Sequence, residues 1–220
     1  MKQIVLFAIL AIVFSSCNSS TSSNPSGGTT IRPGVGSKFV IHQQTFDTSN
    51  RVIDDRIDTV SVIASGTSFA GKTNVVTFKR SNYISYGNYE ANGDMSTYID
   101  GQGAAGEKSG WLLVPIVSKG TASMVVWDTT YISNGTTVHY TGTTSYTFAG
   151  EQTITAAGEN FVTERMNTTE TYSSGSPNYN EIDYLAPRIG YIVKIVNNYT
   201  HPDSRGAIRQ QVDLLSYSLK

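Results

Sequence analysis

The chain has 220 residues and a formal net charge of −1, from 16 Lys and Arg against 17 Asp and Glu. This balance excludes the basic surface by which proteins attract nucleic acids or anionic membranes. Thirteen tyrosines, twenty glycines and a charged fraction of 15% favour β-sheet over helix.

The N-terminal residues 1–16 are predicted to be a lipoprotein signal peptide. Lys2 precedes an apolar run from Ile4 to Phe14, which is well short of the ~20 residues that a membrane-spanning helix needs. Cys17 follows two serines and is the only cysteine of the chain, so it cannot form an internal disulfide. Its position resembles that of the acceptor in a bacterial lipobox, and the resemblance implies lipidation of Cys17. The alternatives are an ordinary signal peptide with a chance cysteine, or a short buried helix.

The next segment, 17–36, is predicted to be a flexible tether between the acylated cysteine and a single β domain at 37–220. Ser, Thr, Asn, Gly and Pro dominate the tether, so it buries too little apolar surface to offset the entropy of ordering. Asn18 follows Cys17 where an Asp would retain some lipoproteins in the inner membrane. We therefore expect an outer-membrane lipoprotein held through Cys17. The tether lacks an acidic cluster, which favours the periplasmic face over the cell surface.

The stretch GTSFAGKT at 66–73 fits the phosphate-loop pattern G-x-x-x-x-G-K-[ST]. Its required residues are Gly66, Gly71, Lys72 and Thr73. The motif binds phosphate only where a helix begins directly after it, because N–H groups at the helix N-terminus meet the anion. The residues that follow, NVVTFKR, alternate as in a strand, with Val76 and Phe78 on one face. We therefore interpret the match as false, and predict a glycine-rich hairpin with Lys72 in solvent and no bound nucleotide or other cofactor.

The rest of the chain is predicted to be a succession of antiparallel strands. Asn92-Gly93 and Asn134-Gly135 are hairpin signals, because both central residues of such turns take positive φ. Apolar and aromatic residues alternate with polar ones in MVVWD at 124–128 and in YTGTTSYTFAG at 140–150. We expect an all-β fold of about ten or eleven antiparallel strands in a meander, curved into a barrel or half-barrel, because large sheets twist and closure protects their edges.

Aromatic residues recur along these predicted strands, and core filling with cross-strand pairing is their ordinary explanation. The functional alternative is that some of them line a concave sheet face that holds an apolar or amphipathic ligand. The candidates for such contacts are Trp127, Tyr131, Tyr140 and Tyr146.

Patterns typical of catalysis or metal binding are not found. G-x-S-x-G is absent, and His, Cys and acidic residues do not recur at ligand spacing, so we predict neither a catalytic residue nor a metal. The three histidines are His42, His139 and His201. A carboxylate pair for glycan cleavage stays open, because the sequence does not show how far apart the carboxyls lie in space. Its candidate members are Glu151, Glu159, Glu164, Glu181 and Asp183.

Two segments resemble exported bacterial β proteins grouped as domains of unknown function. AGENFVTERM at 157–166 is similar to their "AGtF.t.ri" turn and strand, and YLAPRIGYIVKI at 184–195 is similar to their "wyApgvGlVk" segment. The matching residues of the second segment are Ala186, Pro187, Gly190, Val193 and Lys194, while Arg188 and Tyr191 depart from the pattern. The resemblance implies an envelope location and a curved sheet, similar in outline to the half-barrel of lipoprotein carriers that shelter acyl chains. It implies no activity.

These features favour a non-enzymatic envelope lipoprotein that binds a hydrophobic or amphipathic ligand, or another envelope component. The alternative is a secreted hydrolase, acting on glycans, that uses dispersed carboxylates. The two hypotheses differ in what they require of the folded domain: an apolar cavity between sheet faces for the first, and a buried acidic pair in a cleft for the second.

Overall fold

The computed structural model describes residues 30–101, 105–173, 179–201 and 206–220, and the side chains of all of these except 199–201 and 206–208. The signal peptide, Cys17 and residues 17–29 of the tether lie outside these ranges, so lipidation of Cys17 stays a prediction. Within the described ranges, no helix is long and apolar enough to cross a membrane.

The described residues form one antiparallel sheet of twelve strands, in the order β6-β5-β4-β3-β2-β1-β12-β11-β10-β9-β8-β7. Every strand pairs with its neighbours in the chain except β6 with β7, and β1 pairs with β12. The all-β meander expected from the sequence is confirmed, with slightly more strands than expected. The strands are β1 (Lys38–Phe46), β2 (Val52–Phe69), β3 (Lys72–Arg80), β4 (Tyr83–Tyr89), β5 (Met95–Ile99), β6 (Gly110–Val114), β7 (Thr121–Ser133), β8 (Thr136–Ala156), β9 (Glu159–Tyr172), β10 (Tyr179–Ala186), β11 (Tyr191–His201) and β12 (Gly206–Ser218).

Local turn chemistry explains how long strands reverse in two residues. Both residues take positive φ at Ala70-Gly71, at Asn134-Gly135 and at Ala157-Gly158, between β2 and β3, β7 and β8, and β8 and β9 respectively. Such turns match the right-handed twist of the strands that they join. They let neighbouring strands pair up to the turn itself, which is why the meander contains so few long loops.

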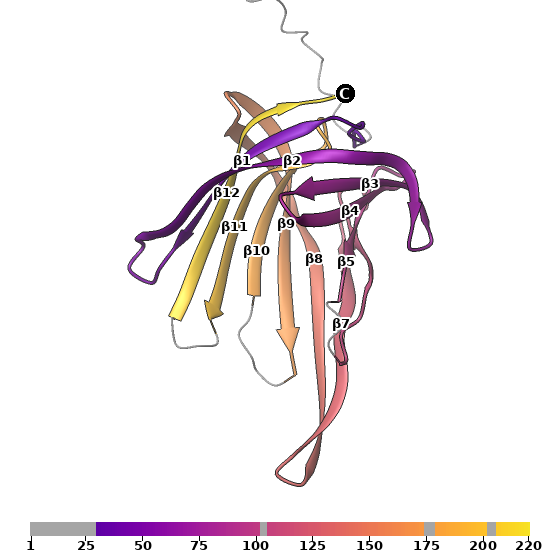
Figure 1. Cartoon of the computed structure of the whole chain (residues 1–220), viewed down its shortest axis with the longest axis vertical. Coiled ribbons are helices and arrows are strands. Elements are labelled where there is room, and N and C mark those ends of the chain that lie inside the picture. Colours follow the sequence, from indigo (N-terminus) through magenta and orange to yellow (C-terminus); the bar gives the residue numbers. More distant parts are fainter. Residues whose placement is uncertain (1–29, 102–104, 174–178, 202–205) are drawn as a thin grey trace, which may run out of the picture.

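The sheet curves round (Figure 1), and its edge strands, β6 and β7, approach each other. Residues 105–108, just before β6, lie along β7 and bridge the gap. The Lys108 N–H donates to the Val126 carbonyl at 2.9 Å, and the Asp128 N–H donates to the Gly106 carbonyl at 2.8 Å. The twelve strands therefore form a nearly closed barrel.

The end of the barrel that lies near the chain's C-terminus is filled with apolar side chains and crossed by residues 30–36. The Ile31 N–H donates to the Pro187 carbonyl at 2.8 Å, and the Gly36 N–H to the Val62 carbonyl at 2.9 Å. The tether, expected to be flexible over 17–36, is thus fixed to the barrel over its last seven residues. The buried core here consists of Phe39, Ile41, Val60, Val62, Val76, Phe78, Tyr89, Phe161, Ala186, Ile189, Val193 and Leu214.

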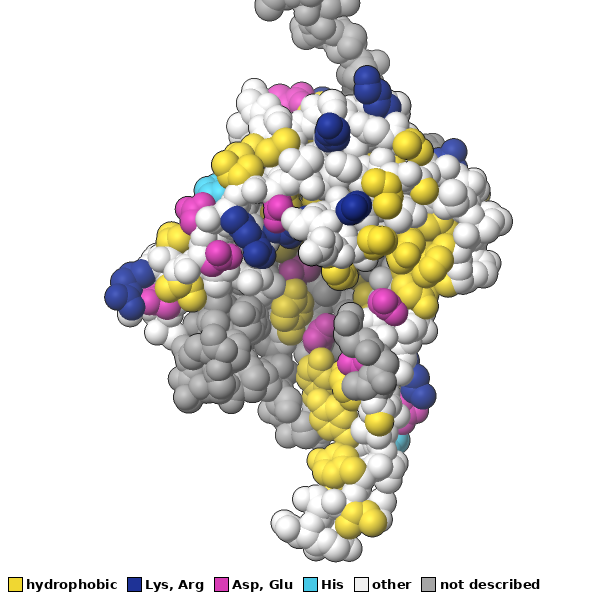
Figure 2. Space-filling view, in the orientation of Figure 1, with side chains coloured by type: hydrophobic (Ala, Val, Ile, Leu, Met, Phe, Trp, Pro, Cys, Tyr) yellow, Lys and Arg dark blue, Asp and Glu magenta, His cyan; other side chains and the backbone are white. Residues whose placement is uncertain are grey.

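The opposite end of the barrel differs from the packed end. There the strands diverge, and the β7–β8 hairpin extends beyond the other strands (Figure 1). The space-filling view shows a hollow on the side in view, above the β7–β8 hairpin, with apolar and acidic side chains inside it (Figure 2). The inner walls of the barrel are therefore the place to look for a site.

Candidate functional site

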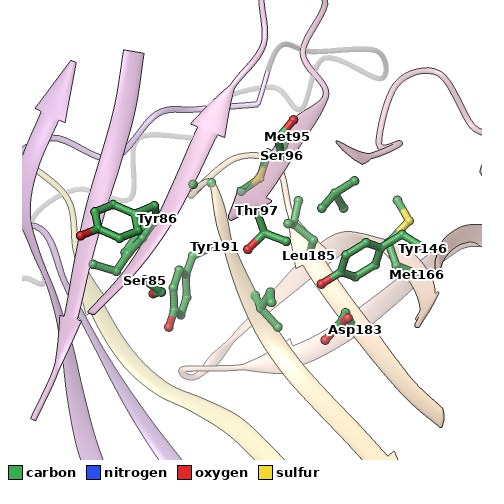
Figure 3. Close-up of a pocket in the computed structure, with 15 residues that line it drawn as sticks. Ser85, Tyr86, Met95, Ser96, Thr97, Tyr146, Met166, Asp183, Leu185 and Tyr191 are labelled. Atoms are coloured by element: carbon green, nitrogen blue, oxygen red, sulfur yellow. The ribbon is translucent and has the colours of Figure 1, made fainter. Parts of the chain in front are cut away.

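A cavity of about 190 Å³ lies inside the barrel, next to the packed end. Strands β3 to β6 supply one wall, and β8 to β11 supply the other (Figure 3). Strands that are distant in sequence thus face each other across one space. The lining residues are Phe78, Ser85, Tyr86, Gly87, Met95, Ser96, Thr97, Val114, Tyr146, Met166, Asp183, Leu185, Gly190, Tyr191 and Ile192.

Most of this lining is apolar. Val114, Met166 and Leu185 are buried members of a second apolar cluster, against which Met95 and Ile192 pack. On the side of the packed core, the ring of Tyr191 stacks on that of Phe39 with centroids 4.0 Å apart. Because methionine side chains are flexible and polarizable, walls of this kind adapt to the shape of an apolar group.

Asp183 is the only residue with a carboxyl among the described residues that line the cavity, and it is 4% exposed. The Thr168 hydroxyl donates to Asp183 Oδ2 at 2.9 Å, while Asp183 Oδ1 has no hydrogen-bond partner among the described residues. Burial raises the pKa of the Asp183 carboxyl well above its usual range, and the negative charge of Glu181 raises it further. Tyr146, shown near Asp183 in Figure 3, has a hydroxyl pKa that burial also raises. Its phenol therefore stays neutral.

Glu181 extends this polar wall along β10. It lies two residues before Asp183, hence on the same face of the strand. The Tyr179 hydroxyl donates to Glu181 Oε2 at 2.5 Å, and Asn197 Nδ2 donates to the same oxygen at 3.3 Å. Burial raises the pKa of the Glu181 carboxyl. Glu181 and Asp183 interact directly, so the barrel interior holds an acidic pair in which Asp183 is buried and Glu181 half-buried.

A third carboxyl, that of Glu170, projects from β9 into the same region. The Thr144 hydroxyl donates to Glu170 Oε1 at 3.3 Å, and the Tyr172 hydroxyl donates to Oε2 at 3.0 Å. Burial, followed by the charge of Glu170, raises the pKa of Tyr172 to about 12. Each of the three carboxyls therefore accepts a hydrogen bond from at least one neutral hydroxyl group, which orients it without supplying a positive charge.

An aromatic row connects this wall with the β7–β8 hairpin. Tyr140 stacks on Tyr172 with ring centroids 5.7 Å apart, and Trp127 meets Tyr140 edge-on at 6.2 Å. Gly142 makes the row possible, because a Cβ at this position would lie 2.6 Å from the Tyr172 ring. The row offers an apolar surface beside the carboxyls.

The four aromatic residues that the sequence suggested as ligand contacts lie in three different places in the structure. Tyr146 lines the cavity, and Trp127 and Tyr140 belong to the aromatic row. Tyr131 lies farther along β7, is 46% exposed and joins neither group. A role of any of them in ligand binding stays a prediction.

The sequence offered five carboxylates as candidate members of a catalytic pair, and only two of them lie close together in the structure. Glu181 and Asp183 meet inside the barrel, whereas the other three form ion pairs elsewhere. These pairs are Glu151 with Lys119 at 3.5 Å, Glu164 with Lys119 at 2.6 Å, and Glu159 with Arg188 at 2.6 Å. Sequence reasoning overlooked Glu170. The signal that could have found the acidic wall is the alternation Tyr179, Glu181, Asp183, Leu185, which places four residues on one face of a strand.

The histidines do not contribute to the cavity in the part of the chain that is described. His42 lies 2.6 Å from Asp55 and His139 lies 2.8 Å from Asp128, in two exposed pairs. The side chain of His201 is outside the described set. No three His, Cys, Asp or Glu side chains of the described residues are grouped as metal ligands would be.

The phosphate-loop match forms a hairpin, as expected. Residues 66–69 end β2, Ala70 and Gly71 make the turn, and Lys72 begins β3, so no helix follows the motif. The expectation that Lys72 lies in solvent is wrong. Its side chain is half-buried and forms an ion pair with Glu90, because β3 runs next to the turn that leads into β5.

Phe69, in the same hairpin, belongs to a separate aromatic cluster. Its ring stacks on that of Tyr86 at 3.9 Å and meets Tyr98 edge-on at 5.0 Å. Trp111 completes the cluster, and its indole N–H donates to the Ala70 carbonyl at 3.0 Å. The residues between the two glycines therefore fasten the turn to β4, β5 and β6.

Comparison with known proteins gives matches at the level of structure only. No family model matches the chain, and no curated protein matches it by sequence. A hypothetical lipoprotein of Escherichia coli, YmcC, is similar in structure with a TM-score of 0.39 and 11% identity, over 84% of this chain and 86% of that one.

Two further solved structures are similar to the chain. One is an inferred lipoprotein of Parabacteroides distasonis, with a TM-score of 0.46 and 11% identity over 86% of this chain and 98% of that one. The other is an inferred exported protein of Bacteroides fragilis with a YmcC-like fold, with a TM-score of 0.43 and 11% identity over 87% of this chain and all of that one. They are described as lipoproteins or exported proteins, in line with the resemblance inferred from the sequence. A likeness of this degree concerns the outline of the fold, and the function below is argued from this chain's own residues.

Proposed function

We propose that the chain is a cell-envelope lipoprotein, anchored to the membrane by an acylated Cys17, whose barrel binds a hydrophobic or amphipathic ligand without transforming it. The signal peptide and the lone cysteine after two serines support export and anchoring. The periplasmic face of the outer membrane is the expected location. The tether segment 30–36 joins the barrel at its packed end, opposite the end at which the strands diverge (Figure 1).

One observation carries the binding function: a cavity of about 190 Å³ with mainly apolar walls and a few oriented polar groups. Ligand sites commonly have this composition, because apolar contact supplies affinity and the polar groups set orientation. Burial of each methylene group of a ligand is worth about 0.8 kcal/mol. A chain of several methylenes is therefore enough for measurable affinity.

The proposal is tested by mass spectrometry of the protein purified from its native envelope, with a variant that fills the cavity. Thr97 lines the cavity (Figure 3), so Thr97→Trp should remove a co-purifying apolar ligand. Thr137→Trp adds the same side chain at an exposed site on the hairpin and should retain the ligand. If wild-type protein carries no ligand and takes up none, the domain acts by contact with another envelope component.

A second candidate function, hydrolysis of glycans, is favoured by one observation, the acidic pair of Glu181 and Asp183 inside the barrel. Glycosidase carboxyls lie about 5 to 9.5 Å apart, so that the scissile bond and a water molecule fit between them. Glu181 and Asp183 instead interact directly, which supports binding over hydrolysis. Chromogenic glycosides and cell-wall glycans test the alternative: cleavage that Asp183→Asn abolishes would establish it.

A further inference from the structure

Two buried acceptor atoms on the polar wall lack a donor. Asp183 Oδ1 and Asn197 Oδ1 have no hydrogen-bond partner among the described residues, although the two residues are only 4% and 6% exposed. The other polar atom of the Asn197 amide is used, because Nδ2 donates to Tyr179 and Glu181. Buried polar atoms are nearly always paired in proteins. Asn197 Oδ1 is an acceptor, and so is Asp183 Oδ1 once its carboxyl is ionised, so the partner that they lack is a donor. The hydrogen bond between the Asp183 and Glu181 carboxyls exists only while the two share a proton.

The described part of the barrel supplies no positive charge to the acidic wall. None of the ion pairs among the described residues includes Glu170, Glu181 or Asp183. Arg80, which projects from β3 toward Tyr191, donates to Asp58 at 2.9 Å and to Gln43 at 2.5 Å. Three carboxyls therefore face one interior without a counter-ion among the described residues.

We propose that the ligand of the barrel is an amphiphile with a protonated primary amine and one apolar chain, and that its ammonium group lies against Asp183 and Glu181. This inference rests on the proposed binding function and deepens it. An ammonium group brings three N–H donors together with a positive charge. Beside Asp183 it supplies the donor that Oδ1 lacks and offsets the charge of the acidic pair, which neither an alcohol nor a carboxylate does.

The cavity limits the apolar part of this ligand. Its volume of about 190 Å³ is slightly larger than that of a cavity of about 150 Å³ that admits benzene. It therefore holds one short alkyl chain or ring, and not both tails of a diacyl lipid. Met95, Met166 and Leu185 surround the chain, while Tyr172, at one end of the aromatic row, donates to Glu170 beside the acidic pair.

Affinity for the amine should increase with pH. Among the described residues, the titratable groups around Asp183 and Glu181 are Tyr179 on β10, Glu170 on β9 and Tyr146 on β8, all of which are neutral or negative. Burial raises the pKa of both Asp183 and Glu181, so the ligand competes with protons for the wall. Below the raised pKa, the apparent affinity falls by up to about tenfold per pH unit, with the fraction of ionised carboxyl.

The test is calorimetric titration of the full mature chain, carrying Cys17→Ala so that no detergent is needed. Octylamine, octanol and octanoate present the same apolar chain with different head groups. We expect octylamine to bind at least about tenfold tighter than octanol, and octanoate to bind most weakly. Asp183→Asn and Glu181→Gln should each remove the preference for the amine while octanol binding stays. Glu151→Gln, at an exposed carboxylate paired with Lys119, should keep the preference.

The outcomes distinguish a failure of amine recognition from a failure of ligand binding altogether. Equal affinity for octylamine and octanol, or tighter binding of octanoate, would overturn recognition of an amine and leave the apolar site standing. Binding of none of the three compounds would overturn both proposals together. An amine preference that survives both Asp183→Asn and Glu181→Gln would show that the head group lies elsewhere.

Discussion

Replacement of Asp183 by Asn should stabilise the unliganded protein at neutral and alkaline pH. Burial raises the folded-state pKa of Asp183 above the unfolded value of about 3.9. Between these two values the folded state holds a proton that the unfolded state has lost. The free energy of unfolding therefore falls as pH rises through this window, and the loss is complete above the raised pKa. An amide does not ionise in this pH range, so the Asp183→Asn variant keeps the free energy of unfolding that the wild-type protein loses.

The magnitude follows from the environment of Asp183. Leaving a buried group unsatisfied costs about 1–3 kcal/mol when the group is neutral and more when it is charged. Ionisation of Asp183, which is 4% exposed with Oδ1 unpartnered, therefore adds a cost of about this size, which the neutral amide avoids. In a domain of this size, each kcal/mol shifts Tm by about 2–4 °C. We therefore expect Asp183→Asn to raise Tm by about 2–12 °C near pH 8, and to change it little near pH 4, where wild-type Asp183 is protonated.

Thermal unfolding across a pH series measures this effect, with Asp58→Asn as a control of opposite sign. The hydrogen bond from Arg80 lowers the pKa of Asp58, so this carboxylate stabilises the fold above its unfolded pKa. Asp58→Asn should lower stability by about 1.5 kcal/mol at neutral pH and approach wild type as pH falls through the lowered pKa. If Asp183→Asn lowered Tm near pH 8, or shifted it equally at all pH values, a partner would be holding Asp183 as an anion and the reasoning would fail.

Three further predictions concern the anchor, the hairpin and the packed end. Cys17→Ala should abolish incorporation of labelled fatty acid and release the protein from membranes; unchanged labelling would contradict lipidation. Lys72→Ala should cost at most about 1 kcal/mol through loss of the ion pair with Glu90, and ATP should leave the wild-type Tm unchanged; an ATP-induced rise in Tm that this variant removes would contradict the hairpin interpretation. Gly190 has a φ of 62°, and a Cβ there would lie 1.8 Å from the Ile31 carbonyl oxygen. Gly190→Ala should therefore cost about 1–3 kcal/mol and detach residues 30–36, as limited proteolysis would show; an unchanged digestion pattern would refute this contact.

Much of the fold could be predicted because its signals are local. Alternation with period two marks strands wherever one face is buried, and Asn134-Gly135 marks a turn whose two residues need positive φ. Closure of the barrel could not be predicted, because the pairing of residues 105–108 with β7 joins two irregular positions of different strands. The half-buried ion pair of Lys72 with Glu90 was missed for a similar reason, since it depends on the path of the chain between β4 and β5.

Only part of the candidate site could be predicted from the sequence. The alternation that contains Glu181 and Asp183 predicts that the two residues share a face, but polar residues occupy both faces of β10, so the pattern does not say which face turns inward. The register between β9 and β10 decides which residues meet them, and it places Met166 opposite Asp183. Strand register depends on contacts across the whole sheet, so it cannot be predicted from the residue pattern of a single segment.

The most direct test of ligand binding inside the barrel is the position of a bound amphiphile in a crystal. Anomalous diffraction from crystals of the mature chain soaked with a bromine-tagged alkylamine locates the end of the apolar chain. We predict a bromine peak among Met95, Met166 and Leu185, with the ammonium density within hydrogen-bond distance of Asp183 Oδ1. A bromine peak outside the barrel, or an ordered amine that does not contact Asp183, would contradict this prediction.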